Sequence, residues 1–173
     1  QSADALGSMK PFFLMSMLYP QYLGCTTVSM EMELMKMVNK ETTEVIGIES
    51  VEEQMGAIDA LSLEDQADML LESIEDFDGQ KESLMEMLEL YKNEDLKALY
   101  ASSSKEFGQY EGFDEIMLTN RNKNWISRME NLMTAKPTFF AVGAAHLGGE
   151  MGVLELLKKA EYSVTPVYST QSA

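Results

Sequence analysis

Residues 137–168 run through four kinds of sequence in an order that restricts the folds open to this chain. PTFFAVG is apolar almost throughout, the next residues are small, and EMGVLELLKKA has the spacing of an amphipathic helix. A second apolar run, YSVTPVY, ends the segment. We predict a β-α-β unit, with a central strand over 138–142 and a helix that begins near Glu150, because a helical crossover joins two parallel strands in such units.

Most of the remaining sequence has helical spacing, with one exception at residues 43–50. TEVIGIES combines β-branched residues with a glycine and predicts a third short strand. The predicted fold class is therefore α/β and mostly helical: a small sheet of about three strands, the C-terminal β-α-β unit and a helical acidic segment over 41–95. So small a sheet predicts that an N-terminal portion completes the fold. A chain of 173 residues fits a single domain over 1–173.

Local signals place several helix ends. KPFFLMSMLYP predicts a short helix with Pro11 in its first turn, and Ser62 begins another helix with Asp65 as an approximate capping box. The longest helix is expected over 113–133, after a loop over 102–112. In VSMEMELMKMVNKE the methionines fall on more than one face, which predicts a helix covered on several sides.

The net charge of −16 comes from one part of the chain. Residues 41–95 contain 18 acidic side chains against Lys81 and Lys92, and the remaining residues balance at 11 acidic and 11 basic. An acidic surface repels phosphate backbones, so nucleic acid is excluded as the expected partner. Solvated helix faces explain this charge, and a surface that recruits cationic peptides is the alternative. No apolar run has the length of a membrane span.

His146 is the only histidine of the chain. It follows the carboxyl end of the predicted strand over 138–142, where open α/β sheets bind ligands. Gly143 and the two alanines after it leave space for a ligand or for another backbone segment. A functional histidine and a structural one both remain open at this point.

Asn122 and Arg121 are the polar residues of interest on the helix over 113–133. Asn122 falls on the apolar stripe, one turn before Trp125, and Arg121 borders that stripe. A buried amide needs a partner, because an unpaired one costs about 1–3 kcal/mol. One interpretation is an interior hydrogen bond with a surface arginine. In the other, Arg121 directs a fixed cation at an anionic group.

Taken together and in order, these motifs resemble the TraB/GumN family. FFAVGAAHLGGEMGVLELLKKAEYSVTPV is similar to the family's C-terminal Gly-x-x-His, helix and final strand, and LTNRNKNW to its Arg-Asn helix. VIGIESVEEQMGAIDALSLEDQ resembles the central segment, with Glu49 at its acidic position. MKPFFL and SMEMELM resemble two earlier elements, with Glu31 where an aspartate is usual. The resemblance extends over nearly the whole chain from Met9 onward.

The resemblance implies a metal-dependent hydrolase or peptidase that acts on peptides, similar to the TIKI proteins. The wider superfamily includes erythromycin-esterase-like and haem-binding ChaN-like proteins. The implied site residues are His146, Arg121, Asn122 and Gly143. His146 would be a ligand of a divalent metal or a general base, and Arg121 would stabilise an oxyanion. The resemblance also favours a location of this chain in the cell envelope or outside the cell.

Two departures from the family pattern restrict this interpretation. The family's first Gly-x-x-His has no counterpart among these residues, and one histidine cannot build a His-rich metal site. The chain alone is therefore expected to be inactive or to require association with a missing N-terminal portion. Glu161 stands where the family usually has a glycine at a helix end, which predicts a different C-cap.

Two further functions remain open. The first is a noncatalytic module whose acidic helices and methionine-rich surfaces bind a peptide, a haem or another protein, because methionine surfaces adapt to varied partners. The second is a homodimer in which exposed sheet edges of two copies pair.

Overall fold

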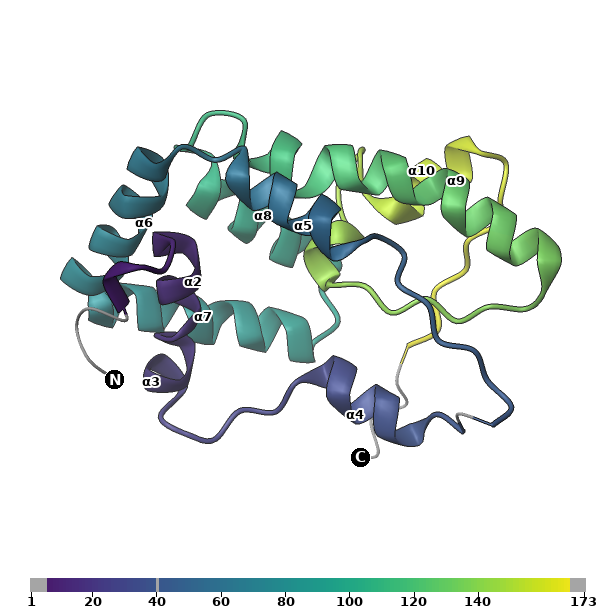
Figure 1. Cartoon of the computed structure of the whole chain (residues 1–173), viewed down its shortest axis with the longest axis horizontal. Coiled ribbons are helices and arrows are strands. Elements are labelled where there is room, and N and C mark those ends of the chain that lie inside the picture. The colour runs from purple at the N-terminus through teal and green to yellow at the C-terminus, as the bar shows by residue number, and fades with distance from the viewer. Residues whose placement is uncertain (1–5, 40, 169–173) are drawn as a thin grey trace. The chain divides into compact units, whose positions relative to one another are not determined.

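The computed structural model describes residues 6–39 and 41–168, and in these ranges the chain consists of helices joined by irregular segments (Figure 1). Its contacts divide it into two compact units, Gln1–Glu86 and Met87–Ala173. A single domain over 1–173 stays a prediction.

The elements follow one another in this order. The first unit contains α2 (Pro11–Ser16), α3 (Tyr19–Leu23), α4 (Met30–Met37), α5 (Val51–Asp59) and α6 (Leu63–Glu75), and α7 (Phe77–Lys92) crosses the boundary. The second unit contains α8 (Leu96–Phe107), the π-helical turn η1 (Glu115–Thr119), α9 (Asn120–Ala135), the 3-10 turn η2 (Ala144–His146) and α10 (Val153–Lys159).

The predicted sheet is wrong. Within 6–39 and 41–168 the structure has no strand, and the segments 43–50, 138–142 and 162–168 are irregular. Phe139, which the β-α-β prediction buries in a central strand, is 81% exposed. A strand needs a neighbouring strand to take up its backbone N–H and C=O groups, and apolar β-branched composition alone supplies none. A dimer through sheet edges therefore has no described strand to use.

Helix starts were predicted correctly where the sequence contains a recognisable capping or first-turn residue, and the other helix ends were predicted less accurately. The Ser62 hydroxyl accepts from the backbone N–H of Asp65 at 2.9 Å, and Pro11 lies at the start of α2, which confirms both predictions. The predicted loop over 102–112 is wrong for its first half, because α8 continues to Phe107. The helix expected near Glu150 begins at Val153, after Gly152 at its N-cap position, so Glu150 is not its cap.

In the first unit α2 packs against α6, and Tyr22 of α3 is one of the buried side chains. The Tyr22 hydroxyl donates to the carbonyl of Ser73 at 2.8 Å, and its ring lies 4.8 Å from that of Phe77. The other buried apolar side chains of this unit are Ile58, Leu61 and Met69. A buried tyrosine whose hydroxyl is paired contributes its ring area without leaving an unpaired polar group.

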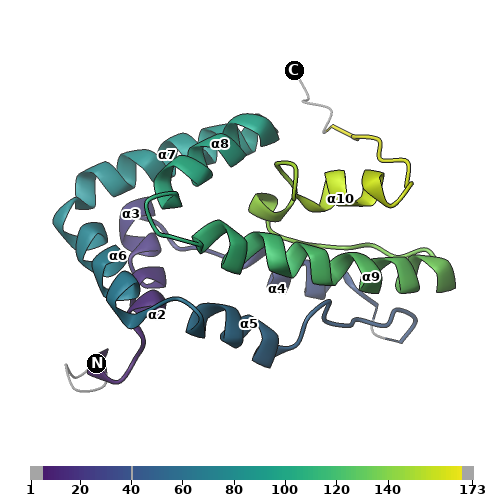
Figure 2. The same ribbon diagram turned by 90° about the horizontal axis from the view of Figure 1, so that it is seen from above.

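The second unit is built around α9. Helix α10 packs against α9, and both views show the two side by side (Figures 1 and 2). Turn η2 contacts α8 and η1. The most deeply buried apolar residues of this unit are Phe113, Trp125, Met129 and Val153. The expected helix over 113–133 is thus largely confirmed, although its first part winds as a π-helix.

Glu161 adopts the left-handed conformation of the glycine that usually stands at this helix end, so the different C-cap predicted for this position is wrong. Its φ is +67°, and the next residue, Tyr162, donates to the carbonyl of Leu157 at 3.0 Å to close the end of α10. This conformation costs a side chain-bearing residue about 1 kcal/mol. We expect Glu161→Gly to raise the free energy of unfolding by about 0.5–1 kcal/mol in urea titrations. Lys159→Gly, inside α10, should lower it by a similar amount, and a destabilising Glu161→Gly would contradict this explanation.

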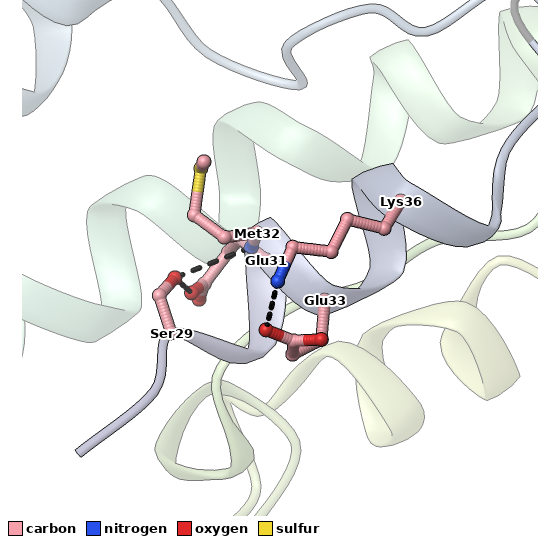
Figure 3. A network of polar contacts seen from close by, with 5 residues as sticks. All are labelled: Ser29, Glu31, Met32, Glu33 and Lys36. Atoms are coloured by element: carbon pink, nitrogen blue, oxygen red, sulfur yellow. Dashed lines mark hydrogen bonds and ion pairs between the residues drawn. The ribbon is translucent and has the colours of Figure 1, made fainter. Parts of the chain in front are cut away.

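Helix α4 exposes three of its four methionines instead of burying them. Met30, Met32 and Met37 are 60%, 60% and 82% exposed, so the coverage on several sides that its sequence predicts is absent among the described residues. Ser29 caps the helix by accepting from the N–H of Met32, and its hydroxyl donates to the Glu31 carboxylate at 2.7 Å (Figure 3). Local polar contacts hold the N-terminal end of α4, and its exposed methionines contribute little burial.

The Ser29–Glu31 contact gives a pH prediction. The Ser29 hydroxyl, together with a backbone hydrogen bond, lowers the pKa of Glu31 below its ordinary value. A carboxylate with a lowered folded-state pKa stabilises the fold above its unfolded pKa, and this contribution disappears as the pH falls through the folded pKa. We expect Ser29→Ala to move the pKa of Glu31 upward in a carboxyl NMR titration. Lys36→Ala, which leaves that bond intact, should move it less. An unchanged pKa in Ser29→Ala would show that the hydroxyl is not the cause.

Candidate functional site

His146 lies in turn η2 of the second unit and is buried, with 8% of its surface exposed. Its backbone N–H donates to the carbonyl of Gly143 at 3.0 Å, which closes the 3-10 turn. A Cβ added to Gly143 would lie 3.7 Å from His146 Cδ2, an ordinary contact distance, so the turn does not require glycine there. Gly143 therefore supports the histidine through its carbonyl group.

Asn122 is the polar partner of this histidine. It is 2% exposed on α9, and its Oδ1 lies 2.7 Å from His146 Nδ1. Its Nδ2 donates to the backbone carbonyls of Met151 at 2.9 Å and of His146 at 3.3 Å. The interior hydrogen bond predicted for a buried asparagine on the apolar stripe is confirmed. One amide thus joins α9 to both ends of the loop that carries His146.

These contacts determine which imidazole nitrogen carries the proton. A carbonyl oxygen can only accept, so the two carbonyl contacts identify the donating Nδ2 end of the amide and leave Oδ1 as an acceptor. His146 must then donate through Nδ1–H. In the neutral ring the lone pair is therefore on Nε2, the nitrogen that can take up a proton or bind a ligand.

Trp125 joins His146 to Arg121. The indole lies against the imidazole, with ring centroids 4.4 Å apart and planes at 40°, and the Arg121 guanidinium lies 5.2 Å from the indole centroid. Arg121 Nη1 also donates to the carbonyl of Met117 at 2.9 Å. The asparagine is bonded in the interior, as the first interpretation expects, and the arginine is held beside the same cluster. That Arg121 directs its charge at an anionic group stays a prediction. Three of the predicted site residues, His146, Asn122 and Arg121, come together around one tryptophan.

A fourth contributor, Tyr100 of α8, was not predicted from the sequence. A Cβ added to Gly148 would lie 2.8 Å from Tyr100 Cβ, and one added to Gly149 would lie 2.4 Å from Tyr100 Cζ. Gly149 also has a φ of +79°, a conformation that favours glycine. The tyrosine therefore packs directly on the backbone after His146. The glycine pair was the available signal, because adjacent glycines permit close approach, but it could not identify which residue approaches.

The sequence profile of one protein family matches residues 1–166: the TraB/PrgY/gumN family. The chain belongs to the TraB/PrgY/gumN family. The resemblance carried by the Gly-x-x-His and Arg-Asn motifs is thereby confirmed. No curated protein and no solved structure matches the chain significantly.

The divalent metal that the family resemblance implies can be tested against the side chains around His146 in this TraB/PrgY/gumN chain. Within residues 6–39 and 41–168 no group of three or more His, Cys, Asp or Glu side chains is placed to hold a metal ion. His146 offers one nitrogen, because its Nδ1 is engaged by Asn122, and protein zinc sites use at least three ligands. The described residues do not fit a complete metal site.

Among the same residues, no helix has both the length and the apolar character needed to cross a bilayer.

Proposed function

We propose that this chain supplies a general-base histidine to a hydrolytic site of the TraB/PrgY/gumN family. The contact between His146 Nδ1 and Asn122 Oδ1 carries this proposal, because Asn122 is itself held by two backbone carbonyls. A base oriented by a third group is the recurring arrangement in enzymes that activate a nucleophile. Peptides are the proposed substrate class, which follows from the family resemblance.

The chemistry assigned to each residue follows from its contacts. His146 Nε2 takes a proton from the water that attacks a carbonyl carbon, and Asn122 Oδ1 stabilises the resulting imidazolium through Nδ1–H. Arg121, held by Trp125 and the carbonyl of Met117, supplies a fixed positive charge that favours a developing oxyanion. Gly143 positions the histidine through the turn. No step is assigned to a metal, because the described residues do not complete a site for one.

An activated ester tests the base without requiring the rest of a peptidase site. We expect the chain to hydrolyse p-nitrophenyl acetate, and His146→Gln to lose about a hundredfold or more of that rate, since general bases contribute roughly 10²–10⁴-fold. Lys123→Gln, an exposed change on the same helix, should keep the rate. Equal rates for wild type and His146→Gln, or no hydrolysis by the wild type, would contradict the proposal.

The same assay with a peptide library should give a different result. Hydrolysis of an amide demands more of a site than hydrolysis of an activated ester, because the amine must be protonated as it leaves whereas p-nitrophenolate leaves without a proton. Only His146, Asn122 and Arg121 are assigned to the reaction, and the family's first Gly-x-x-His has no counterpart among these residues. We expect the ester to be hydrolysed and the peptides to remain intact. Metal-free peptide cleavage by the chain alone would show that this description of the site omits a catalytic group.

A second candidate function, a partner-binding module, is supported by α4. Its exposed methionines, with Val28 at 71% exposure before them, present apolar area in a strongly acidic protein. A cationic amphipathic peptide matches both properties. Fluorescence anisotropy with a labelled Lys- and Leu-rich helical peptide should show salt-dependent binding that weakens in Met30→Gln/Met37→Gln. Equal binding by this variant and the wild type would exclude α4 as the binding surface.

A further inference from the structure

We propose that Tyr100 is a positioning residue for His146, acting through the backbone of the loop at residues 143–152. This inference rests on the proposed function, since it concerns the same histidine. Tyr100 does not need to contact substrate. Its role is to hold the loop in the conformation in which His146 Nδ1 reaches Asn122.

The contact between Tyr100 and the loop leaves no space for a side chain on either glycine. A Cβ on Gly148 would lie 2.8 Å from Tyr100 Cβ and 3.1 Å from its Cγ, and a Cβ on Gly149 would lie 2.4–2.7 Å from its Cζ, Cε1 and Oη. The near end of the tyrosine thus lies over Gly148 and the far end over Gly149. Real Cβ atoms essentially never lie within 3.0 Å of another heavy atom, and each glycine has at least one contact below that distance. A side chain at either position would therefore displace the ring or the loop.

A second close approach makes the loop compact. A Cβ on Gly152 would lie 2.4 Å from the carbonyl oxygen of Leu147 and 2.2 Å from that of Gly148. The chain therefore folds back on itself between His146 and the start of α10. Tyr100 contacts the middle of this compact turn from α8, while Asn122 bonds the carbonyls of His146 and Met151 from α9.

The hydrogen bonds of Asn122 and the packing contacts of Tyr100 have different roles. Asn122 holds the imidazole by a hydrogen bond, whose strength depends on atoms staying within a few tenths of an ångström. The glycines of the loop have no side chains that could limit its motion, so the loop needs an external surface to fix its backbone. Tyr100 supplies that surface. Removing the ring should therefore weaken the Nδ1–Oδ1 bond although neither of its partners is changed.

A nitrogen-15 NMR spectrum of the full chain reads this effect directly, because its one histidine gives one pair of ring nitrogens. In Tyr100→Ala we expect the signals of Nδ1 and Nε2 to move toward each other, as the Nε2–H tautomer becomes populated. We also expect the amides of residues 144–149 to exchange on the order of tenfold faster, the response of a loosened local segment. Tyr100→Phe should retain the wild-type spectrum. Tyr91→Ala, at a half-exposed tyrosine on α7, should do the same.

Tyr100→Leu keeps the test decisive if the alanine variant does not fold, because it retains apolar volume and loses the flat ring. Wild-type tautomer signals and wild-type amide exchange in a folded Tyr100→Ala or Tyr100→Leu protein would overturn the inference. This result is separable from failure of the proposed function. A wild-type chain that hydrolyses no ester would contradict the general-base role, whereas the difference between wild type and Tyr100 variants would still decide whether Tyr100 positions the loop.

Discussion

Asn122→Ala is expected to lower the free energy of unfolding by about 3–5 kcal/mol. The substitution removes one acceptor and two donor contacts, and it leaves the imidazole N–H and the carbonyls of His146 and Met151 without this partner. A buried polar group that loses its partner costs about 1–3 kcal/mol, and a small cavity adds to that. Chemical denaturation followed by the fluorescence of the single tryptophan, which lies in the same cluster, measures the effect.

Asn124→Ala is the matched control, since Asn124 is exposed on the same helix. We expect it to change the unfolding free energy by less than about 0.5 kcal/mol. If Asn122→Ala were as mild as this control, the amide would not be holding the loop, and the tautomer assigned to His146 would lose its basis.

Trp125→Ala is expected to have a comparable effect, also about 3–5 kcal/mol, because large-to-small changes at buried aromatic positions cost this much. Trp125 is 3% exposed, lies against the imidazole of His146, and carries the Arg121 guanidinium on its ring. The loss of the guanidinium contact alone would account for about 0.5–1 kcal/mol. Because the variant lacks the fluorophore, far-UV circular dichroism is the appropriate probe.

Trp125→Phe separates the contribution of a buried aromatic ring from the specific contacts of the indole with His146 and Arg121. It retains an aromatic ring, so we expect a smaller loss, about 1–2 kcal/mol. The double variant Asn122→Ala/Trp125→Ala should be less destabilised than the sum of its parts, because both residues contact His146 and interact through it. Strict additivity would mean that the two residues act independently and that no single cluster exists.

The sequence predicted the parts of this structure that depend on neighbours along the chain. Ser62 with Asp65, and Pro11 at a first turn, are local signals, and both helix starts are where they were expected. The burial and pairing of Asn122 also followed from helical spacing, because a residue's position on a helix face is set by its distance from the apolar residues around it.

The errors concern properties that depend on distant residues. The apolar run over 138–142 has the composition of a buried strand, but composition does not supply the neighbouring strand that a ladder needs. The end of α8 was misplaced because its serines have little preference for helix or loop, and contacts made by the folded chain decided between them. The contact of Tyr100 with Gly148 and Gly149 could not be predicted, because no sequence pattern in either segment indicates that the two lie close together.

Asn122 fixes His146 as the Nδ1–H tautomer, which leaves Nε2 as the basic nitrogen. A long-range nitrogen–proton correlation spectrum of the uniformly nitrogen-15-labelled chain, recorded at a pH where the ring is neutral, measures this tautomer. We expect Nδ1 to resonate as the protonated nitrogen and Nε2 as the unprotonated one. A spectrum with the proton on Nε2, or with two averaged nitrogen signals, would contradict this assignment.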